Sequence, residues 1–290
     1  MKYRLRHRTE YAYSEAVDLS YHLLRLSPRV LPFQTVEEAT ITADPVPATR
    51  ADAVDYFGNG TAHLTLSEPH AQFAVELNAT LEVTRVAPSD LQATPPWESV
   101  RDALRAPGTP ELIEASEFVF DSPLATPTPD IAAYAATSFS AGRPVLEAVR
   151  DLTSRIFRDF AFDPAATIVS TPLAQVMEQR RGVCQDFAHL QVAALRAMGL
   201  AARYVSGYIR TYRADQSSFV GADASHAWVS LFVPGMGWID FDPTNDLIVA
   251  EEHIVLGWGR DYGDVSPVRG VILGGGQHFV TVAVEVTPLA

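Results

Sequence analysis

Short alternations of apolar and polar residues mark the N-terminal part of the chain. In the segment YRLRHRTEYAY, the residues Tyr3, Leu5 and His7 alternate with charged neighbours, and ATITAD, TAHLTL and QFAVELNATLEV repeat the pattern. A period of two is typical of β-strands with one buried face. The glycine-containing segment YFGNGT, residues 56–61, separates two such runs and predicts a turn. The pattern therefore predicts an N-terminal β-domain over residues 1–90.

Proline and small polar residues interrupt this pattern. The segment APSDLQATPPWE, residues 87–98, is rich in both and predicts a linker. The segments TPELIEASEF and PDIAAYAATSF follow, each with a proline near its start, where a helix tolerates the missing N–H group. We expect residues 91–144 to form a linker and a helical connection.

A helical period replaces the alternation in RPVLEAVRDLTSRIFRDF. Its apolar stripe consists of Val145, Val149, Leu152, Ile156 and Phe160. The segment TPLAQVMEQR predicts a second helix, which we expect Gly182 to end. A third helix is predicted from about Cys184 to Met198, with Gly199 as its stop signal.

Strands return after the third predicted helix. The segments ARYVSGYIR, HAWVSLFV and WIDFDP are rich in β-branched and aromatic residues, and a glycine-rich loop precedes a last strand, HFVTVAVEV. These patterns predict a core domain over residues 145–250. Residues 251–290 are predicted to form a C-terminal loop and strands that close onto one of the two domains. The fold class is therefore α+β.

Composition narrows the classes of function. The chain has 290 residues, a single cysteine, a formal net charge of −13 and an isoelectric point near 5.0. One cysteine excludes an intrachain disulfide and a cysteine-rich metal centre. The acidic balance disfavours nucleic acid and anionic membranes as partners. No secretory leader or long apolar span is visible, so we expect a cytoplasmic protein; the oligomeric state is open.

The single cysteine, Cys184, occupies the predicted start of a helix. Free N–H groups and the positive end of the helix dipole stabilise a thiolate there. The alternative is a packing role, because cysteine is among the most buried residue types. A working thiol nucleophile also needs a base and a group that orients the base.

The best candidate base is His226, which opens a predicted strand. That strand and the next form a hairpin through PGMG, and the simplest register pairs Phe232 with Trp238. In this register His226 shares a face with Asp240 and Asp242, and Asp242 lies diagonal to it, within side-chain reach. A slip of one residue would separate them. We prefer Asp242 as the orienting carboxylate, with ordinary strand-end aspartates as the alternative.

Three ordered blocks carry a resemblance to a known family. They are G-V-C-Q-D around Cys184, H-A-W-V from His226, and W-x-x-x-D-P-T, which contains Asp242. Over residues 145–246 these blocks resemble the core of the transglutaminase-like superfamily, which is distantly papain-like. The segments RHRTEYAYSEAV, DYFGN and GRDYGDVSPVRGVILGGGQH resemble a bacterial branch often described as cysteine proteases. The resemblance implies a papain-like core, with a helix-start cysteine and an antiparallel sheet, after an N-terminal β-sandwich-like domain.

The resemblance also implies a reaction. Cys184 would be the nucleophile, His226 the base and Asp242 the orienting residue of a catalytic triad. Such a site transfers an acyl group from a peptide or glutamine amide bond of a peptide or protein substrate, through a thioester, with no metal or organic cofactor. We favour hydrolysis, hence a peptidase or amidase, because an amine acceptor must be bound and water excluded. Glutamine–amine cross-linking and an idle binding module are the alternatives.

Two details of the expected site stay open. The backbone N–H of Cys184 is expected in the oxyanion hole, with a second donor not identified. The segment GRDYGDVSP, residues 259–267, contains Asp261 and Asp264, which would line the cleft, cap a helix or form a turn.

Overall fold

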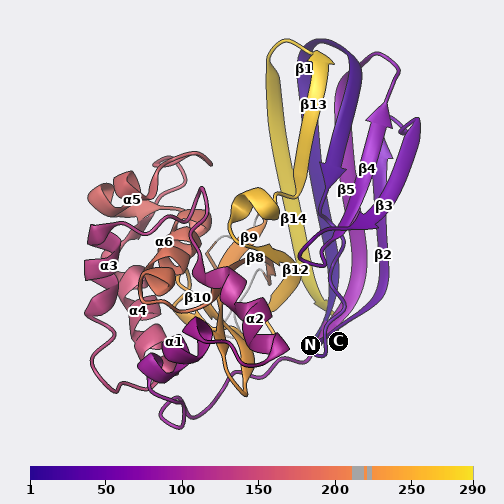
Figure 1. Ribbon diagram of the computed structural model, residues 1–290. Helices are drawn as coiled ribbons and strands as arrows, with labels where there is room; N and C mark the ends of the chain where they lie inside the picture. Colours follow the sequence, from indigo (N-terminus) through magenta and orange to yellow (C-terminus); the bar gives the residue numbers. More distant parts are fainter. Residues whose placement is uncertain (211–218, 221–223, 290) are drawn as a thin grey trace.

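Two β-sheets organise the protein, and helices gather on the side away from the N-terminal domain (Figure 1). The computed structural model describes residues 1–210, 219–220 and 224–289. A seven-stranded sheet contains strands from both ends of the chain, and a five-stranded sheet comes from the second half. No helix in the described part of the chain is long and apolar enough to span a bilayer.

The N-terminal domain is built around one long strand, β1 (Lys2–Leu24). The other strands of its sheet are β2 (Gln34–Asp44), β3 (Thr49–Val54), β4 (Gly60–Leu66), β5 (His70–Val83), β13 (Val268–Gly274) and β14 (His278–Leu289). The first half of β1 pairs with β5 and β14, and the second half pairs with β4 and β13. The two halves pack on each other, and the ring of His22 stacks on Phe73 at 4.0 Å. The β-sandwich-like prediction is confirmed, and the two C-terminal strands close onto this domain.

Seven helical segments lie between β5 and the second sheet in the described part of the chain. They are α1 (Trp97–Arg105), α2 (Pro110–Ser116), η1 (Glu117–Val119), α3 (Pro129–Ala136), α4 (Val145–Asp159), α5 (Leu173–Gln179) and α6 (Cys184–Ala197). Thr109 and Thr128 cap α2 and α3, with a proline at the first helical turn, as the sequence predicts. The predicted apolar stripe of α4 is buried.

The expected role of Gly182 is wrong. Helix α5 ends at Gln179 because Arg180 takes the left-handed conformation, with φ of 54°. Gly182 lies instead in the short strand β7 (Arg181–Gly182), which pairs with β6 (Ala161–Phe162). A Cβ at this position would lie 2.6 Å from a carboxylate oxygen of Asp186, so the glycine makes room for the start of α6.

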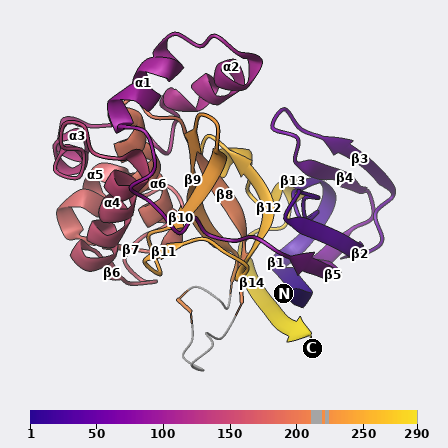
Figure 2. The ribbon, with the colours of Figure 1, turned by 90° about the horizontal axis from the view of Figure 1, so that it is seen from below.

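The five-stranded sheet lies against helix α6. Its strands are β8 (Ala202–Ile209), β9 (His226–Val233), β10 (Gly237–Asp242), β11 (Leu247–Ile248) and β12 (His253–Gly259), in the order β11-β10-β9-β8-β12. Figure 2 shows the helices on one side of this sheet and the N-terminal domain on the other. Phe232 pairs with Trp238, which confirms the hairpin register. Strand β12 lies beyond the predicted boundary at residue 250, yet it pairs with β8 and completes the sheet.

The two domains meet through β8 and β12. Tyr208, Ile254 and Leu256 pack into the apolar core of the N-terminal domain. The hydroxyl of Tyr208 also lies 2.6 Å from Nδ1 of His7, whose other ring nitrogen contacts Thr9. Burial lowers the pKa of His7 to about 4, so the ring is neutral in this interface at pH 7.

This interface predicts a pH-dependent stability. Between the ordinary histidine pKa of 6.5 and about 4, the unfolded chain binds a proton at His7 and the folded chain does not. Stability therefore falls as the pH drops through this window, by roughly 2 kcal/mol at pH 5 from this residue. In His7→Leu, the difference in unfolding free energy between pH 7 and pH 5 should shrink by about that amount. His63→Leu, at an exposed position, is the control; an unchanged difference in His7→Leu would contradict the prediction.

Candidate active site

The lone thiol, Cys184, is the first residue of α6 and is half-buried. The start of the helix is fixed by Asp186, whose carboxylate accepts hydrogen bonds from the N–H of Val183 at 2.8 Å and the hydroxyl of Thr167 at 2.6 Å. Cys184 lines a pocket of about 410 Å³ together with His226, Tyr204 and other residues. The thiol therefore opens onto a cavity, which a purely packing cysteine would not need to do.

The structure brings two of the predicted site residues into direct contact. Nε2 of His226 lies 2.8 Å from Oδ2 of Asp242, and both side chains are fully buried. Nδ1 of His226 has no hydrogen-bond partner among the described residues. The imidazole and the Cys184 thiol line the same pocket. The three predicted residues therefore lie together: the ring of His226 contacts the carboxylate and shares a pocket with the thiol.

The charges of this pair favour the imidazolium form. Burial by itself lowers the pKa of His226, but the carboxylate of Asp242 and the neighbouring Cys184 outweigh it and raise the pKa. Burial would raise the pKa of Asp242, but His226 and His253 together lower it. An imidazolium next to a thiol stabilises the thiolate, which is the nucleophilic form.

Asp242 has further donors that the sequence analysis missed. Nε2 of His253 lies 3.1 Å from Oδ2, and Nδ2 of Asn245 donates to the same oxygen at 2.9 Å. The N–H groups of Thr244 and Asn245 donate to Oδ1. Aspartate side chains often accept a hydrogen bond from the backbone N–H two residues later and so form a turn. The segment D-P-T-N therefore predicts these two hydrogen bonds. Nothing in the sequence near the hairpin points to His253, which comes from β12.

Asp240 has different partners. Its Oδ2 accepts hydrogen bonds from Nε1 of Trp228 at 2.9 Å and from Nη1 of Arg85 at 2.5 Å. Burial would raise the pKa of Asp240, but Arg85 lowers it. This carboxylate therefore balances a buried arginine and does not contact His226.

The same cluster offers atoms that could bind a metal ion. The ligand atoms of His226, Asp242 and His253 lie within 4.8 Å of one another. Their separations of 2.8 and 3.1 Å are hydrogen-bond distances. A tetrahedral zinc ion with bonds of about 2.1 Å would hold its ligand atoms roughly 3.4 Å apart. The present geometry therefore fits a hydrogen-bonded cluster better than a metal centre.

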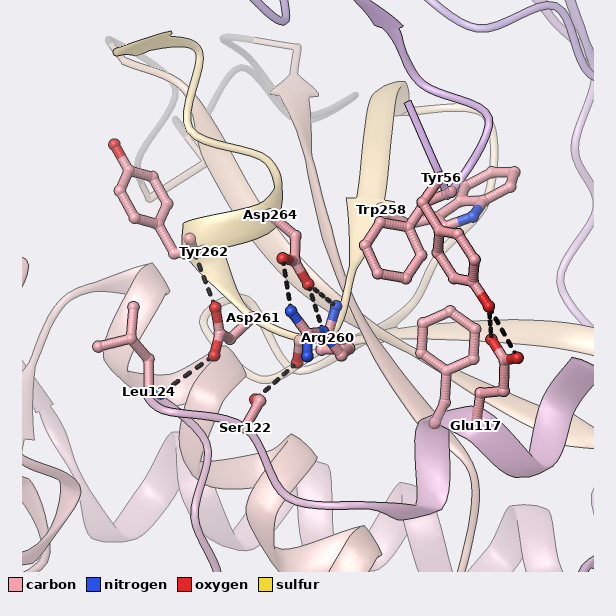
Figure 3. A network of polar contacts seen from close by, with 12 residues as sticks. Tyr56, Glu117, Ser122, Leu124, Trp258, Arg260, Asp261, Tyr262 and Asp264 are labelled. Atoms are coloured by element: carbon pink, nitrogen blue, oxygen red, sulfur yellow. Dashed lines mark hydrogen bonds and ion pairs between the residues drawn. The ribbon is translucent and has the colours of Figure 1, made fainter. Parts of the chain in front are cut away.

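The segment 259–267 contributes Tyr262 to the thiol pocket, and Figure 3 shows the polar contacts that this segment makes. The carboxylate of Asp261 accepts from the N–H of Leu124 at 3.0 Å, and Asp264 forms an ion pair with Arg260 at 2.9 Å. Asp261 also caps the short helix η2 (Tyr262–Asp264), which follows it directly. The two acidic residues hold the loop in place, while Tyr262 lines the pocket.

Tyr204 is a further pocket residue that the sequence analysis did not single out. It lies on β8, lines the pocket with Cys184, and has only 2% of its surface exposed. Burial, and then the negative charge of Cys184, raise the pKa of Tyr204 well above its ordinary value. Its hydroxyl therefore keeps its proton and can donate a hydrogen bond inside the pocket.

Comparison with known proteins agrees with this geometry. Residues 3–82 match the bacterial transglutaminase-like N-terminal region, and residues 132–243 match the transglutaminase-like superfamily. The chain belongs to the transglutaminase-like superfamily. An uncharacterized protein of Mycobacterium tuberculosis is 40% identical over 99% of this chain and 93% of its own length.

Two other relatives carry functional descriptions. A proposed cysteine protease from Cytophaga hutchinsonii superposes with a TM-score of 0.77 at 20% identity, over the whole of this chain and 91% of its own. A protein-glutamine gamma-glutamyltransferase of Pseudomonas aeruginosa is 30% identical over 37% of this chain and 17% of its own length. The first likeness shows the shared α+β fold with its N-terminal β-domain.

The two aspartates should differ in their effect on the thiol. Because Cys184 is the only cysteine, alkylation by iodoacetamide reports on it alone. Asp242→Asn removes the charge that raises the pKa of His226, so the imidazolium is lost at lower pH. We expect the alkylation rate at pH 7 to fall about tenfold or more, since one pKa unit is a factor of ten.

Asp240→Asn is the matched control for this measurement. It should leave the alkylation rate near that of the wild type but lower the unfolding free energy by roughly 3 kcal/mol, because buried Arg85 loses its counter-charge. Equal alkylation rates in the two variants would mean that Asp242 does not act on the thiol through His226.

His253 should matter through the position of Asp242. His253→Phe removes the donor at 3.1 Å, whereas His253→Gln keeps an N–H group there. We expect the alkylation rate at pH 7 to fall several-fold in His253→Phe and to recover in His253→Gln. A loss of the same size in both variants, with equally lowered unfolding midpoints, would indicate a role in packing alone.

Proposed function

We propose that this protein is a cysteine-dependent acyl-transfer enzyme that hydrolyses amide bonds of peptides or of glutamine side chains through a thioester. One observation carries the proposal: a single pocket gathers the lone thiol at a helix start and a buried histidine, and a buried carboxylate lies 2.8 Å behind that histidine. This is the nucleophile, base and orienting group of a cysteine hydrolase.

The first half of the reaction forms the thioester. The thiolate of Cys184 attacks the amide carbon, and the carbonyl oxygen becomes an oxyanion. The His226 imidazolium gives its Nδ1 proton to the leaving amine as the carbon–nitrogen bond breaks. Asp242 holds the ring through Nε2 and stabilises its charged form.

The second half releases the acid. Neutral His226 takes a proton from a water molecule while the oxygen of that water attacks the thioester carbon. The carbon–sulfur bond then breaks, which leaves Cys184 as the thiolate and His226 as the imidazolium. In both halves we place the oxyanion against the N–H of Cys184 and the hydroxyl of Tyr204, since both groups belong to residues of the pocket wall.

Water is the preferred acceptor in this proposal. The described residues that line the thiol pocket include no carboxylate that could bind a cationic amine. The Cytophaga hutchinsonii protein is also described as a proposed protease. Amine transfer is the second candidate, since the Pseudomonas aeruginosa relative is named a glutamyltransferase, over 37% of this chain. A binding module without catalytic activity would not require Cys184, His226 and Asp242 to lie together in one cluster.

A peptide library tests the proposal directly. The protein is incubated with the library with and without a primary amine, and the products are identified by mass spectrometry. We expect cleaved or deamidated peptides in both conditions and none with Cys184→Ala. Amine-linked products as the main species would favour transfer instead, and products that persist in Cys184→Ala would exclude the thiol as nucleophile.

Tyr204→Phe separates oxyanion stabilisation from thiol activation. Loss of one oxyanion donor lowers kcat by about 100-fold or more. We expect such a loss in turnover of a peptide found in the library, with the alkylation rate of Cys184 within about twofold of wild type. If the substitution leaves kcat unchanged, Tyr204 does not stabilise the oxyanion.

A further inference from the structure

A second and larger pocket, of about 670 Å³, lies between the N-terminal domain, α2 and the five-stranded sheet. It shares no lining residue with the thiol pocket. Successive residues of a strand point to opposite faces, and β8 serves both pockets in this way: Arg203 lines the larger one and Tyr204 the thiol pocket. The larger pocket is thus a separate cavity.

The guanidinium of Arg203 lies in this pocket between two aromatic rings. It lies 4.1 Å from the ring centroid of Trp238 and 3.7 Å from that of Trp258. Only 9% of the residue is exposed, and its buried Nε has no hydrogen-bond partner among the described residues. The carboxylate of Asp240 partly offsets the burial of this guanidinium by its charge, but the hydrogen bonds to its Oδ2 come from Arg85 and Trp228, and its Oδ1 has no hydrogen-bond partner among the described residues.

Arg29 provides the contrast within the same stack. Its guanidinium lies 3.5 Å from the centroid of Trp258, but its Nη1 donates to the carbonyl of Phe57 at 3.1 Å and to Oδ1 of Asn59 at 2.7 Å. A stacked arginine in this fold can therefore be satisfied by the protein. A buried donor without a partner is costly, so an acceptor that enters the pocket and reaches the guanidinium of Arg203 would be stabilised there.

The charges of the pocket define what would fit. Its buried side carries Arg203 and Arg85, the second of which is paired with Asp240 behind it, and its walls are aromatic. Its outer part carries three exposed carboxylates, Glu111, Glu114 and Glu117. Figure 3 shows Glu117 bound by the hydroxyl of Tyr56, close to Trp258. A matching ligand would have an anionic group that faces Arg203, an apolar group that contacts the aromatic walls, and a cationic group that faces the glutamates.

We propose that this pocket binds the α-carboxylate of a free amino acid or short peptide, with Arg203 as its anchor. A guanidinium presents a planar pair of N–H donors that matches a carboxylate, and the two tryptophans hold that plane in position. The three outer glutamates would repel a dianion such as phosphate and attract the ammonium group of an amino acid or a basic peptide.

Binding is measured by isothermal titration calorimetry and by quenching of tryptophan fluorescence, since Trp238 and Trp258 line the pocket. The probes are leucine, the dipeptide Lys-Leu, the amide of Lys-Leu, and inorganic phosphate. We expect saturable binding of leucine or Lys-Leu, and the stronger of the two identifies the source of the carboxylate. The amide should bind at least tenfold more weakly. Equal binding of the amide, stronger binding of phosphate, or no binding of either carboxylate would overturn the proposal.

Two arginine variants sharpen the test. Arg203→Met keeps an unbranched side chain between the tryptophans but removes the donors, and should weaken Lys-Leu binding at least tenfold. Arg29→Met, on the other face of Trp258, should leave it within about threefold. Unchanged affinity in a folded Arg203→Met protein would overturn the proposal, and if that variant unfolds, the wild-type comparison of Lys-Leu with its amide decides.

Discussion

The site depends on one buried carboxylate, Asp242. Its two oxygens accept hydrogen bonds from His226, His253, Asn245 and Thr244, which come from β9, β12 and the turn after β10. A buried charge is tolerated only when donors surround it, and removing one partner of a buried pair costs about 3–5 kcal/mol. The need to satisfy this carboxylate therefore fixes the positions of three separate segments, and with them the ring that faces the thiol.

Strand β12 links this site to the N-terminal domain. It begins with His253, which contacts Asp242, and continues with Ile254 and Leu256, which pack into the core of the N-terminal sheet. The chain then returns through β13 and β14 to pair with β1. The N-terminal domain thus supports the strand that carries a donor to the site, although it contributes none of the three proposed catalytic side chains.

Much of this architecture was readable from the sequence because the relevant interactions are local. Periods of two and 3.6 predicted the strands and helices, since each period reflects which side of an element is buried. The short PGMG turn fixed the hairpin register, which placed His226 and Asp242 on one face. The helix start at Cys184 followed from the same local pattern, and the three blocks in order indicated the superfamily.

Tertiary structure decided what depends on residues far apart in the chain. His253 and Tyr204 reach the site from β12 and β8, and the two tryptophans around Arg203 come from β10 and β12. Gly182 was assigned the wrong role because its constraint is the carboxylate of Asp186 rather than the end of a helix. Local patterns report which face of an element is buried, but not which distant element covers it, because that choice is made by packing and by the pairing of buried charges.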